Sequence, residues 1–228
     1  MDSRAEGLHV VVPAYCEAEV IADTVAALVK IFPDVIVVDD NSPDATARLA
    51  SIAGATVLRH PVNLGQGAAL QTGIAFALDR GAAYVATFDA DGQHRPADLQ
   101  AMFRVLLDER VDIVLGSRFL GATERIPPSR SLLLKAAVLF SRTTTGLNLS
   151  DTHNGLRVMT AGAARALDIR QNRMAHASEI IEAIARRRLS YREAPVTIRY
   201  SDYSLRKGQK LTGTVNILVD LMVAWLRQ

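Results

Sequence analysis

Apolar positions follow two alternating patterns through the first half of the chain. Short runs rich in Val and Ile are separated by longer segments in which apolar residues recur every three or four positions, the period of an amphipathic helix. We expect strands at 9–12, 34–38, 56–59, 84–88 and 112–115, and helices at 20–32, 42–52, 68–79 and 96–109. Ser42 is expected to cap the second of these helices, with Pro43 at its first position. Strands that alternate with helices in this way are typical of βαβ units and a parallel sheet.

The second half of the chain has a less regular pattern. We expect an apolar and basic helix at 130–145, a strand or turn at 151–159, a helix at 175–188, a strand at 190–200 and a long apolar helix at 210–227. The apolar stretch of the last helix is too short to cross a bilayer, and Asp220 interrupts it. We therefore expect no transmembrane segment.

Composition is that of an ordinary globular protein, with 49% hydrophobic and 22% charged residues among 228. The single cysteine, Cys16, excludes an internal disulfide framework. The polar N-terminus does not resemble a signal peptide, so we expect a cytoplasmic location.

Charge is distributed unevenly along the chain, although the formal net charge is only +2. Residues 1–124 carry 9 Lys and Arg against 17 Asp and Glu, a net of −8, whereas residues 125–228 carry 17 against 7, a net of +10. A basic half favours anionic partners such as phosphates, nucleic acid or a membrane surface. Only 5% of the residues are aromatic, and they do not interleave with arginines, so we expect no nucleic-acid partner.

The most informative stretch is 84–94, in which a strand-like run ends in Asp89, Asp91 and Gly92. Mg²⁺ is typically held by one or two carboxylates together with substrate oxygens. Two other polar clusters, at 13–17 and 39–42, also follow expected strands. Ligands of open parallel sheets bind beyond the carboxyl ends of the strands. We therefore expect the three clusters to converge on one ligand.

Six stretches, taken in this order, resemble family 2 glycosyltransferases with the GT-A fold. They are VVPAYCE at 11–17, VVDDNSPD at 37–44, NLGQG at 63–67, FDADGQH at 88–94, GSR at 116–118 and DTHNGLR at 151–157. Each is weak alone, but together they are specific. Within the family, the chain most resembles the dolichol- or polyprenyl-phosphate sugar synthase branch.

The resemblance implies an α/β GT-A fold, with a Rossmann-like, mostly parallel central sheet flanked by helices. It implies one domain over 1–228, in which 1–120 bind the nucleotide-sugar and 121–228 form the acceptor side. The implied activity is inverting and metal-dependent transfer of a sugar from a UDP- or GDP-sugar to a polyprenyl phosphate. The alternative acceptor is a saccharide hydroxyl in cell-surface polysaccharide synthesis. A sugar-phosphate nucleotidyltransferase fits less well, because 13–17 is not a Gly-rich loop containing arginine.

The resemblance also implies roles for individual residues. The nucleotide-sugar is expected to contact Pro13, Ala14, Tyr15, Glu17, Asp39, Asp40, Gly65, Asp89, Ala90 and Arg118. A cofactor ion, Mg²⁺ or Mn²⁺, is expected at Asp89, Asp91 and Gln93. The expected catalytic residues are Asp91, Arg118, Arg130, Asp151 and Glu179, with both arginines facing the diphosphate or the acceptor phosphate.

The residues themselves leave several alternatives open. Asp151 and Glu179 are candidate general bases, which a hydroxyl acceptor requires and an ionised phosphate does not. Either can instead pair with an arginine. The turn 63–67 either binds an anion or serves only as a turn, and 39–42 either contacts the nucleotide or only begins a helix. His94 is either a metal ligand or an exposed loop residue.

Two departures from the family pattern concern the acceptor side. The loop 201–210 has altered spacing, and Ser178 precedes Glu179 where many hydroxyl-directed relatives carry a Glu-Asp pair. The arginines at 186–188 either end a helix and face solvent, or contact the cytoplasmic face of a membrane together with 130–145, which would attach the protein peripherally. The C-terminal helix at 210–227 is a candidate contact between copies of the chain.

Overall fold

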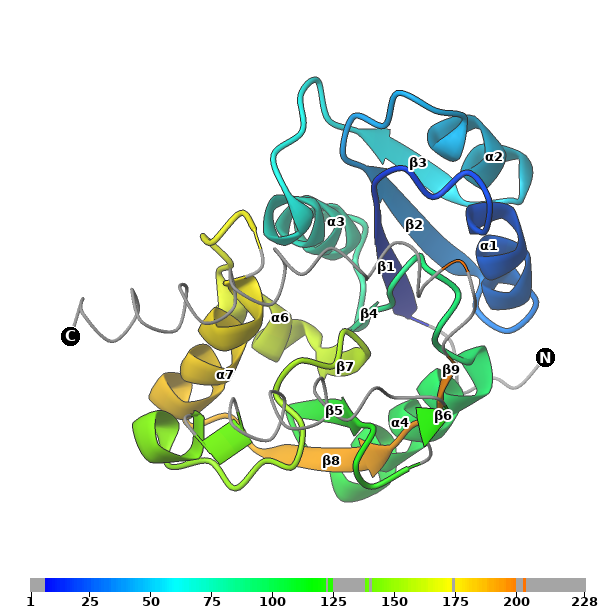
Figure 1. Cartoon of the computed structure of the whole chain (residues 1–228). Helices are drawn as coiled ribbons and strands as arrows, with labels where there is room; N and C mark the ends of the chain where they lie inside the picture. Colours follow the sequence, from blue (N-terminus) through cyan, green and yellow to red (C-terminus); the bar gives the residue numbers. More distant parts are fainter. Residues whose placement is uncertain are drawn as a thin grey trace.

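A central sheet organises the computed structural model, which describes residues 7–121, 123–124, 138–139, 141–173, 175–199 and 203. Its strands are β1 (Leu8–Ala14), β2 (Asp34–Asp39), β3 (Thr56–Arg59), β4 (Tyr84–Thr87), β5 (Ile113–Ser117), β7 (Arg157–Thr160) and β8 (Tyr191–Pro195). Across the sheet they lie in the order β3-β2-β1-β4-β7-β5-β8 (Figure 1). Only β7 runs antiparallel to its neighbours, β4 and β5. A second sheet pairs β6 (Thr123–Glu124) with β9 (Ile198–Arg199) in parallel.

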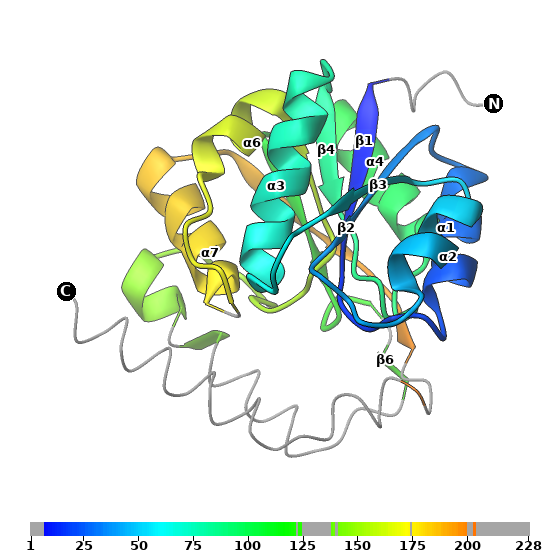
Figure 2. The ribbon, with the colours of Figure 1, turned by 90° about the horizontal axis from the view of Figure 1, so that it is seen from above.

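Helices cover both faces of the central sheet (Figures 1 and 2). They are α1 (Ile21–Val29), α2 (Thr46–Ile52), α3 (Gln66–Asp79), α4 (Pro96–Glu109), α6 (Ala161–Leu167) and α7 (His176–Arg187). Helices α1, α2 and α4 pack against one face, and α3, α6 and α7 pack against the other. The result is a layered α/β/α architecture, which confirms the expected α/β class.

Both faces of the sheet are buried at its inner strands, and this explains the sequence pattern of those strands. On β1, the side chains of Val10 and Val12 enter the core beneath α1, α2 and α4, whereas Val11 enters the core beneath α3. All three are fully buried. A strand that is covered on both faces needs apolar residues at consecutive positions, so its sequence does not alternate.

The expected strands and helices of the first half are confirmed, with ends that move by a few residues. The expected cap of α2 is wrong. That helix begins at Thr46, and the Ser42 hydroxyl instead accepts a hydrogen bond from the Cys16 amide at 2.9 Å. Cys16 has a positive φ of 55°, so the chain reverses there and its amide points back toward Ser42.

The second half differs more from expectation. The segment 151–159 is a loop until β7 begins at Arg157, and α6 was not expected. That helix is short, and the Thr160 hydroxyl caps it by accepting the Ala163 amide at 3.1 Å. The segment 190–200 divides between β8 and β9.

Parts of two expected helices lie outside the described residues. Of 130–145, residues 138–139 and 141–145 are described, and they are helical. The segment 210–227 is not among the described residues. Within the part of the chain that is described, no helix combines the length and the apolar character that crossing a membrane requires.

One edge of the sheet gathers the segments that matter for function. Strands β1, β2 and β4 are parallel, so the residues that follow them lie at a common edge. The reversed direction of β7 brings its first residue, Arg157, to the same edge, opposite Thr87 and Leu115. The loop 150–156 therefore arrives beside the loop 88–94.

Close packing of α3 on the sheet yields a stability prediction. A Cβ atom at Gly73 would lie 2.3 Å from Val11 Cγ1 and 3.0 Å from Val38 Cγ2. Alanine favours a helix over glycine by ~1 kcal/mol, but overpacking a core costs ~1–3 kcal/mol. We expect Gly73→Ala to lower the free energy of unfolding in urea by about 1 kcal/mol or more. In the control Gly162→Ala, the new Cβ meets only Thr160 Oγ1 at 3.8 Å, and equal stability of the two variants would contradict the prediction.

Candidate active site

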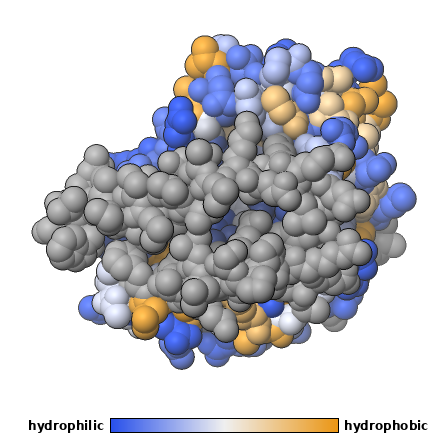
Figure 3. Space-filling view, in the orientation of Figure 1, coloured by the Kyte–Doolittle hydropathy of each residue, from blue (hydrophilic) through white to orange (hydrophobic). Residues whose placement is uncertain are grey.

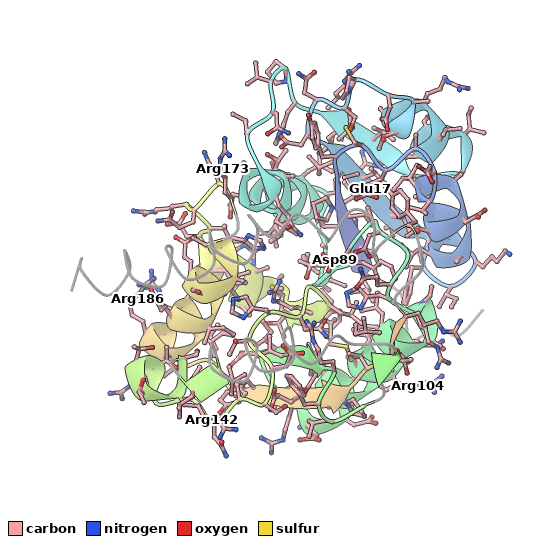
Figure 4. The ribbon with its side chains drawn as sticks, in the orientation of Figure 1. Glu17, Asp89, Arg104, Arg142, Arg173 and Arg186 are labelled. Atoms are coloured by element: carbon pink, nitrogen blue, oxygen red, sulfur yellow. The ribbon has the colours of Figure 1, made fainter. Side chains whose placement is uncertain are left out.

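The three polar clusters that follow β1, β2 and β4 meet at one edge of the sheet, as expected. The Asp40 amide donates to the Ala14 carbonyl at 2.9 Å, which joins the ends of β2 and β1. Figure 4 shows Asp89 near the centre of this edge and Glu17 on the loop that follows β1. Pro13, Ala14 and Ala90 are buried around this junction, whereas Tyr15 is 45% exposed.

Asp89 is held in place by one side chain from α3 and one from its own loop. Gln66 Nε2 donates to Asp89 Oδ1 at 3.3 Å, and His94 Nε2 lies 3.1 Å from Asp89 Oδ2. Burial opposes ionisation of Asp89, but the hydrogen bond and charge of His94 and the charge of Arg157 outweigh it and hold its pKa below the usual value. Asp89 is therefore ionised at neutral pH and remains 28% exposed. His94 itself is buried, which disfavours the exposed-loop alternative.

Asp91 has the opposite tendency. Burial raises its pKa to about 6, and the negative charge of Asp89 adds to this effect. Its Oδ1 accepts the Gln93 amide at 3.1 Å. A shared site for two carboxylates is unfavourable unless a cation offsets their charge. These oxygens therefore suit a divalent ion.

The arrangement also suits an ion that completes its coordination with substrate. Among the described residues, no group of three or more His, Cys, Asp and Glu side chains forms a metal cage. Two carboxylates supplemented by substrate oxygens are the usual environment of Mg²⁺. Gln93, whose backbone carbonyl accepts the Arg199 amide at 3.1 Å, stays a predicted third ligand.

Asp40 has an architectural role in this structure. Its Oδ1 accepts the Leu64 amide at 2.9 Å and lies 2.7 Å from His60 Nδ1, and its Oδ2 accepts the Gly65 amide at 2.7 Å. Burial opposes ionisation, but these hydrogen bonds outweigh it and lower the pKa of Asp40. The carboxylate therefore fixes the turn 63–65.

Three backbone amides of the turn 63–67 donate to acceptors within the protein. Besides the bonds of Leu64 and Gly65 to Asp40, the Gly67 amide donates to the Asn172 carbonyl at 2.8 Å. These donors already have acceptors, which favours the turn over the anion-binding alternative. A nucleotide-sugar contact through Gly65 stays a prediction.

Asp39 is fully buried, and its carboxylate has two partners. Its Oδ2 lies 3.1 Å from Arg59 Nε. The Ser42 amide donates to both oxygens of Asp39, each at 3.3 Å. The Arg59 side chain is 55% exposed and also donates to the Ser42 carbonyl at 2.9 Å. The partly exposed Arg59 thus pairs with a carboxylate that is itself buried. Contact of Asp39 with the nucleotide stays a prediction.

Tyr203 contacts the loop after β1, and no sequence signal indicated it. Its hydroxyl donates to Glu17 Oε2 at 2.7 Å and lies 3.1 Å from the Cys16 carbonyl. Burial and the negative charge of Glu17 raise the pKa of Tyr203. The contact joins positions 186 residues apart. It places a residue from near the C-terminus against the expected nucleotide loop.

Arg118 and Asp151 form a buried ion pair. Arg118 Nε donates to Asp151 Oδ2 at 2.6 Å, and one terminal nitrogen of Arg118 donates to the His153 carbonyl at 3.0 Å. Asp151 Oδ1 accepts the His153 amide at 3.1 Å. Both oxygens of Asp151 are thus engaged. The geometry favours the ion-pair alternative for Asp151 over a role as general base.

Glu179 holds a loop rather than an arginine side chain. Its two oxygens accept the Arg170 amide at 3.2 and 3.0 Å, and one of them accepts the Gln171 amide at 2.9 Å. The next carbonyl, that of Asn172, receives the Gly67 amide. Glu179 therefore supports the contact between α7 and the start of α3, and its role as a base stays a prediction. Arg130 lies outside the described residues.

Arg157 and His176 belong to the surroundings of Asp89, although sequence reasoning did not single them out. Both are buried, and both interact electrostatically with Asp89. Burial and the charge of Arg157 lower the pKa of His176 to about 4, so this histidine is neutral. Arg157 is the last residue of the motif at 151–157, of which only Asp151 was a predicted site residue.

The arginines at 186–188 lie away from this site. They end α7, and β8 starts at Tyr191 and runs parallel to β5, so they lie at the opposite edge of the sheet. Figure 4 shows Arg186 far from Asp89. Their position favours the plain helix-end alternative over a membrane contact shared with the site.

The layered fold and the carboxylates at the end of β4 define a glycosyltransferase of the GT-A fold. The model described as glycosyl transferase family 2 matches residues 9–167, so the chain belongs to that family.

Individual relatives match nearly the whole chain. It is 30% identical to the undecaprenyl-phosphate mannosyltransferase of Micrococcus luteus, over 94% of this chain and 92% of the relative. It is 26% identical to the UDP-N-acetylglucosamine–dolichyl-phosphate N-acetylglucosaminyltransferase of Methanococcus voltae, over 95% of each. These matches confirm the expected polyprenyl-phosphate branch.

A solved structure supports the fold. Glucosyl-3-phosphoglycerate synthase from Mycobacterium tuberculosis, in complex with Mg²⁺ and uridine diphosphate, superimposes with a TM-score of 0.72. The identity is 16%, over 95% of this chain and 78% of that chain. At this identity the likeness concerns the fold.

Two ion pairs of the chain allow a test of the role of Asp151. Breaking a buried pair costs ~3–5 kcal/mol, whereas a surface pair contributes ~0–1 kcal/mol. We expect Asp151→Asn to lower the free energy of unfolding in urea by about 3 kcal/mol. The matched control is Asp168→Asn, because the pair of Asp168 and Arg170 is exposed. An Asp151→Asn protein that is as stable as the control but inactive would restore the base hypothesis.

Proposed function

We propose that this glycosyltransferase moves a sugar from a UDP- or GDP-sugar to a polyprenyl phosphate, with inversion and with Mg²⁺ or Mn²⁺. The observation that carries the proposal is the pair Asp89 and Asp91 at the end of β4, with opposed pKa shifts. The names of the relatives from Micrococcus luteus and Methanococcus voltae support polyprenyl-type phosphates as acceptors. The ions bound by the synthase of the same fold support the cofactor.

On the donor side, the chain would bind and orient the nucleotide diphosphate. Asp89, Asp91 and Gln93 would hold the ion, and a bound divalent ion stabilises the negative charge that develops on a diphosphate leaving group. His94 and Gln66 fix the orientation of Asp89 in advance. Preorganised groups of this kind need little reorganisation during the reaction.

On the acceptor side, the reaction is one displacement. An oxygen of the acceptor phosphate forms a bond to the anomeric carbon, and the bond from that carbon to the diphosphate oxygen breaks. The bonding electrons leave with the nucleoside diphosphate, and one displacement inverts the configuration. A phosphate oxygen is already ionised at neutral pH, so no base is required. This agrees with Asp151 and Glu179, whose carboxylates are engaged in structural bonds.

Exposed apolar side chains support a lipid acceptor. Of six large hydrophobic residues that are exposed among the described ones, Tyr15, Val62, Leu64 and Leu120 follow the carboxyl ends of β1, β3 and β5. The strands are parallel, so these four belong to the edge that carries Asp89. Figure 3 shows hydrophobic residues in separate patches on the described surface of one face. We include in the proposal peripheral binding to the cytoplasmic face of a membrane.

Removal of one metal carboxylate tests the donor side. Binding of Mn²⁺ with UDP or GDP should raise the melting temperature of the wild-type protein, because a ligand at a hundred times its Kd stabilises by ~2.7 kcal/mol. In Asp91→Asn, the part of this increase that depends on Mn²⁺ should disappear. Transfer should fall by about a hundredfold or more, as for loss of one electrostatic stabiliser. Differential scanning fluorimetry and initial rates measure both effects.

Asp108→Asn is the control for this experiment, because Asp108 is exposed near the end of α4. It should respond to Mn²⁺ and nucleotide as the wild type does. Full transfer activity in Asp91→Asn, or no stabilisation of the wild-type protein by any nucleotide with Mn²⁺, would refute the donor assignment.

Glu179→Gln distinguishes the two acceptor classes. Loss of a general base costs ~10²–10⁴-fold in rate. With a polyprenyl phosphate acceptor, we expect the initial rate of Glu179→Gln to stay within about tenfold of the wild type, since no base is needed. Assays with polyprenyl phosphate and with oligosaccharides are run side by side. Transfer to a sugar hydroxyl that Glu179→Gln abolishes would favour the saccharide alternative.

A further inference from the structure

The loop 150–156 passes directly against the carboxylate of Asp89. A Cβ atom placed on Gly155 would lie 2.1 Å from Asp89 Oδ2 and 2.3 Å from Asp89 Oδ1. A Cβ atom does not approach a nonbonded oxygen atom so closely, so any side chain at position 155 must displace the carboxylate or the loop. The space that Asp89 occupies therefore exists because residue 155 is a glycine.

The backbone of Gly155 is held by the last residue of β4, two positions before Asp89. Thr87 Oγ1 donates to the Gly155 carbonyl at 2.6 Å. At the other end of the loop, Asp151 is bound to Arg118. Hydrogen bonds at Asp151 and at Gly155 thus hold the loop at both ends, and Asp89 packs against it.

The polar groups around Asp89 are not all satisfied. Among the described residues, His94 Nδ1, Asn154 Nδ2 and Arg157 Nη1 are buried side-chain atoms without a hydrogen-bond partner. Asn154 adjoins Gly155 in the loop, and the charges of His94 and Arg157 act on Asp89. Buried polar atoms without partners are rare in native proteins. Three such atoms near Asp89 indicate that a bound ligand supplies their missing hydrogen-bond partners.

We propose that Gly155 is a positioning residue for the metal site. Its missing side chain sets the place of the Asp89 carboxylate, and its carbonyl, held by Thr87, keeps the loop 151–156 against that carboxylate. The second half of the chain thereby shapes an ion site whose proposed ligands all come from the first half. This inference rests on the proposed function, because it takes Asp89 as a ligand of Mg²⁺ or Mn²⁺.

Gly155→Ala tests the inference through binding of the ion itself. Titration of free Mn²⁺ by electron paramagnetic resonance, with UDP present, gives the dissociation constant of the ion. We expect at least a tenfold increase in that constant for Gly155→Ala. High Mn²⁺ concentrations should restore part of the transfer rate. A purely structural defect would not respond to the ion in this way.

Thr87 supplies a milder pair of variants. Thr87→Val removes the hydroxyl at nearly constant shape and should weaken Mn²⁺ binding, whereas Thr87→Ser keeps the hydroxyl and should bind Mn²⁺ as the wild type does. Gly162→Ala is the control for adding a methyl group, since its Cβ meets only one atom, at 3.8 Å. If Gly155→Ala does not fold, the Thr87 pair decides.

The outcomes separate this inference from the proposed function. Wild-type Mn²⁺ affinity in both Gly155→Ala and Thr87→Val would overturn the inference and leave the proposed function intact. A wild-type protein that binds no Mn²⁺ in the presence of UDP or GDP would overturn both. Weakened Mn²⁺ binding in Gly155→Ala and Thr87→Val, with normal binding in Thr87→Ser and Gly162→Ala, is the result that supports the inference.

Discussion

The reversed direction of β7 is the constraint on which the site depends. Because β7 lies between β4 and β5 and runs against both, its first residue, Arg157, stands level with Thr87 and Leu115. A parallel strand in that place would begin at the opposite edge, and the loop 150–156 would lie far from Asp89. The reversal therefore brings a loop from the second half of the chain against a carboxylate from the first half.

The carboxylates at this edge of the sheet differ in how far protein groups compensate their negative charge. This difference indicates where a cation would bind. Asp39 and Asp40 already have protein partners, Arg59 for the first and backbone amides for the second. Asp89 is compensated by His94 and Arg157, but Asp91 is not compensated to the same degree, and burial together with the charge of Asp89 raises the pKa of Asp91 to about 6. An added divalent cation relieves repulsion at the second pair, whereas at the first pair it would compete with existing bonds.

The first half of the fold could be predicted from the sequence because its strands β1 and β2 are apolar runs buried on both faces, and turns separate its strands from its amphipathic helices. In the second half, the helix expected at 175–188 is confirmed as α7, whereas the short helix α6, which follows β7 directly, was not expected. In the site, the sequence indicated the carboxylates but not their partners. Asp39 and Asp40 look equivalent in the sequence, yet successive side chains of an extended segment point in opposite directions. Contacts such as Tyr203 with Glu17 join distant positions and leave no local signal.

The engaged state of the two candidate bases bears on the choice of acceptor. Asp151 neutralises a buried arginine, and Glu179 receives three hydrogen bonds from two backbone amides. To act as a base, either carboxylate would have to break these hydrogen bonds. For Asp151, this would also leave the charge of a buried arginine uncompensated. In the proposed function, Asp89 and Asp91 hold the cation and do not act as bases. A nucleophile that arrives already ionised avoids this conflict, and a phosphate on a lipid meets that requirement beside the exposed apolar residues of the same edge.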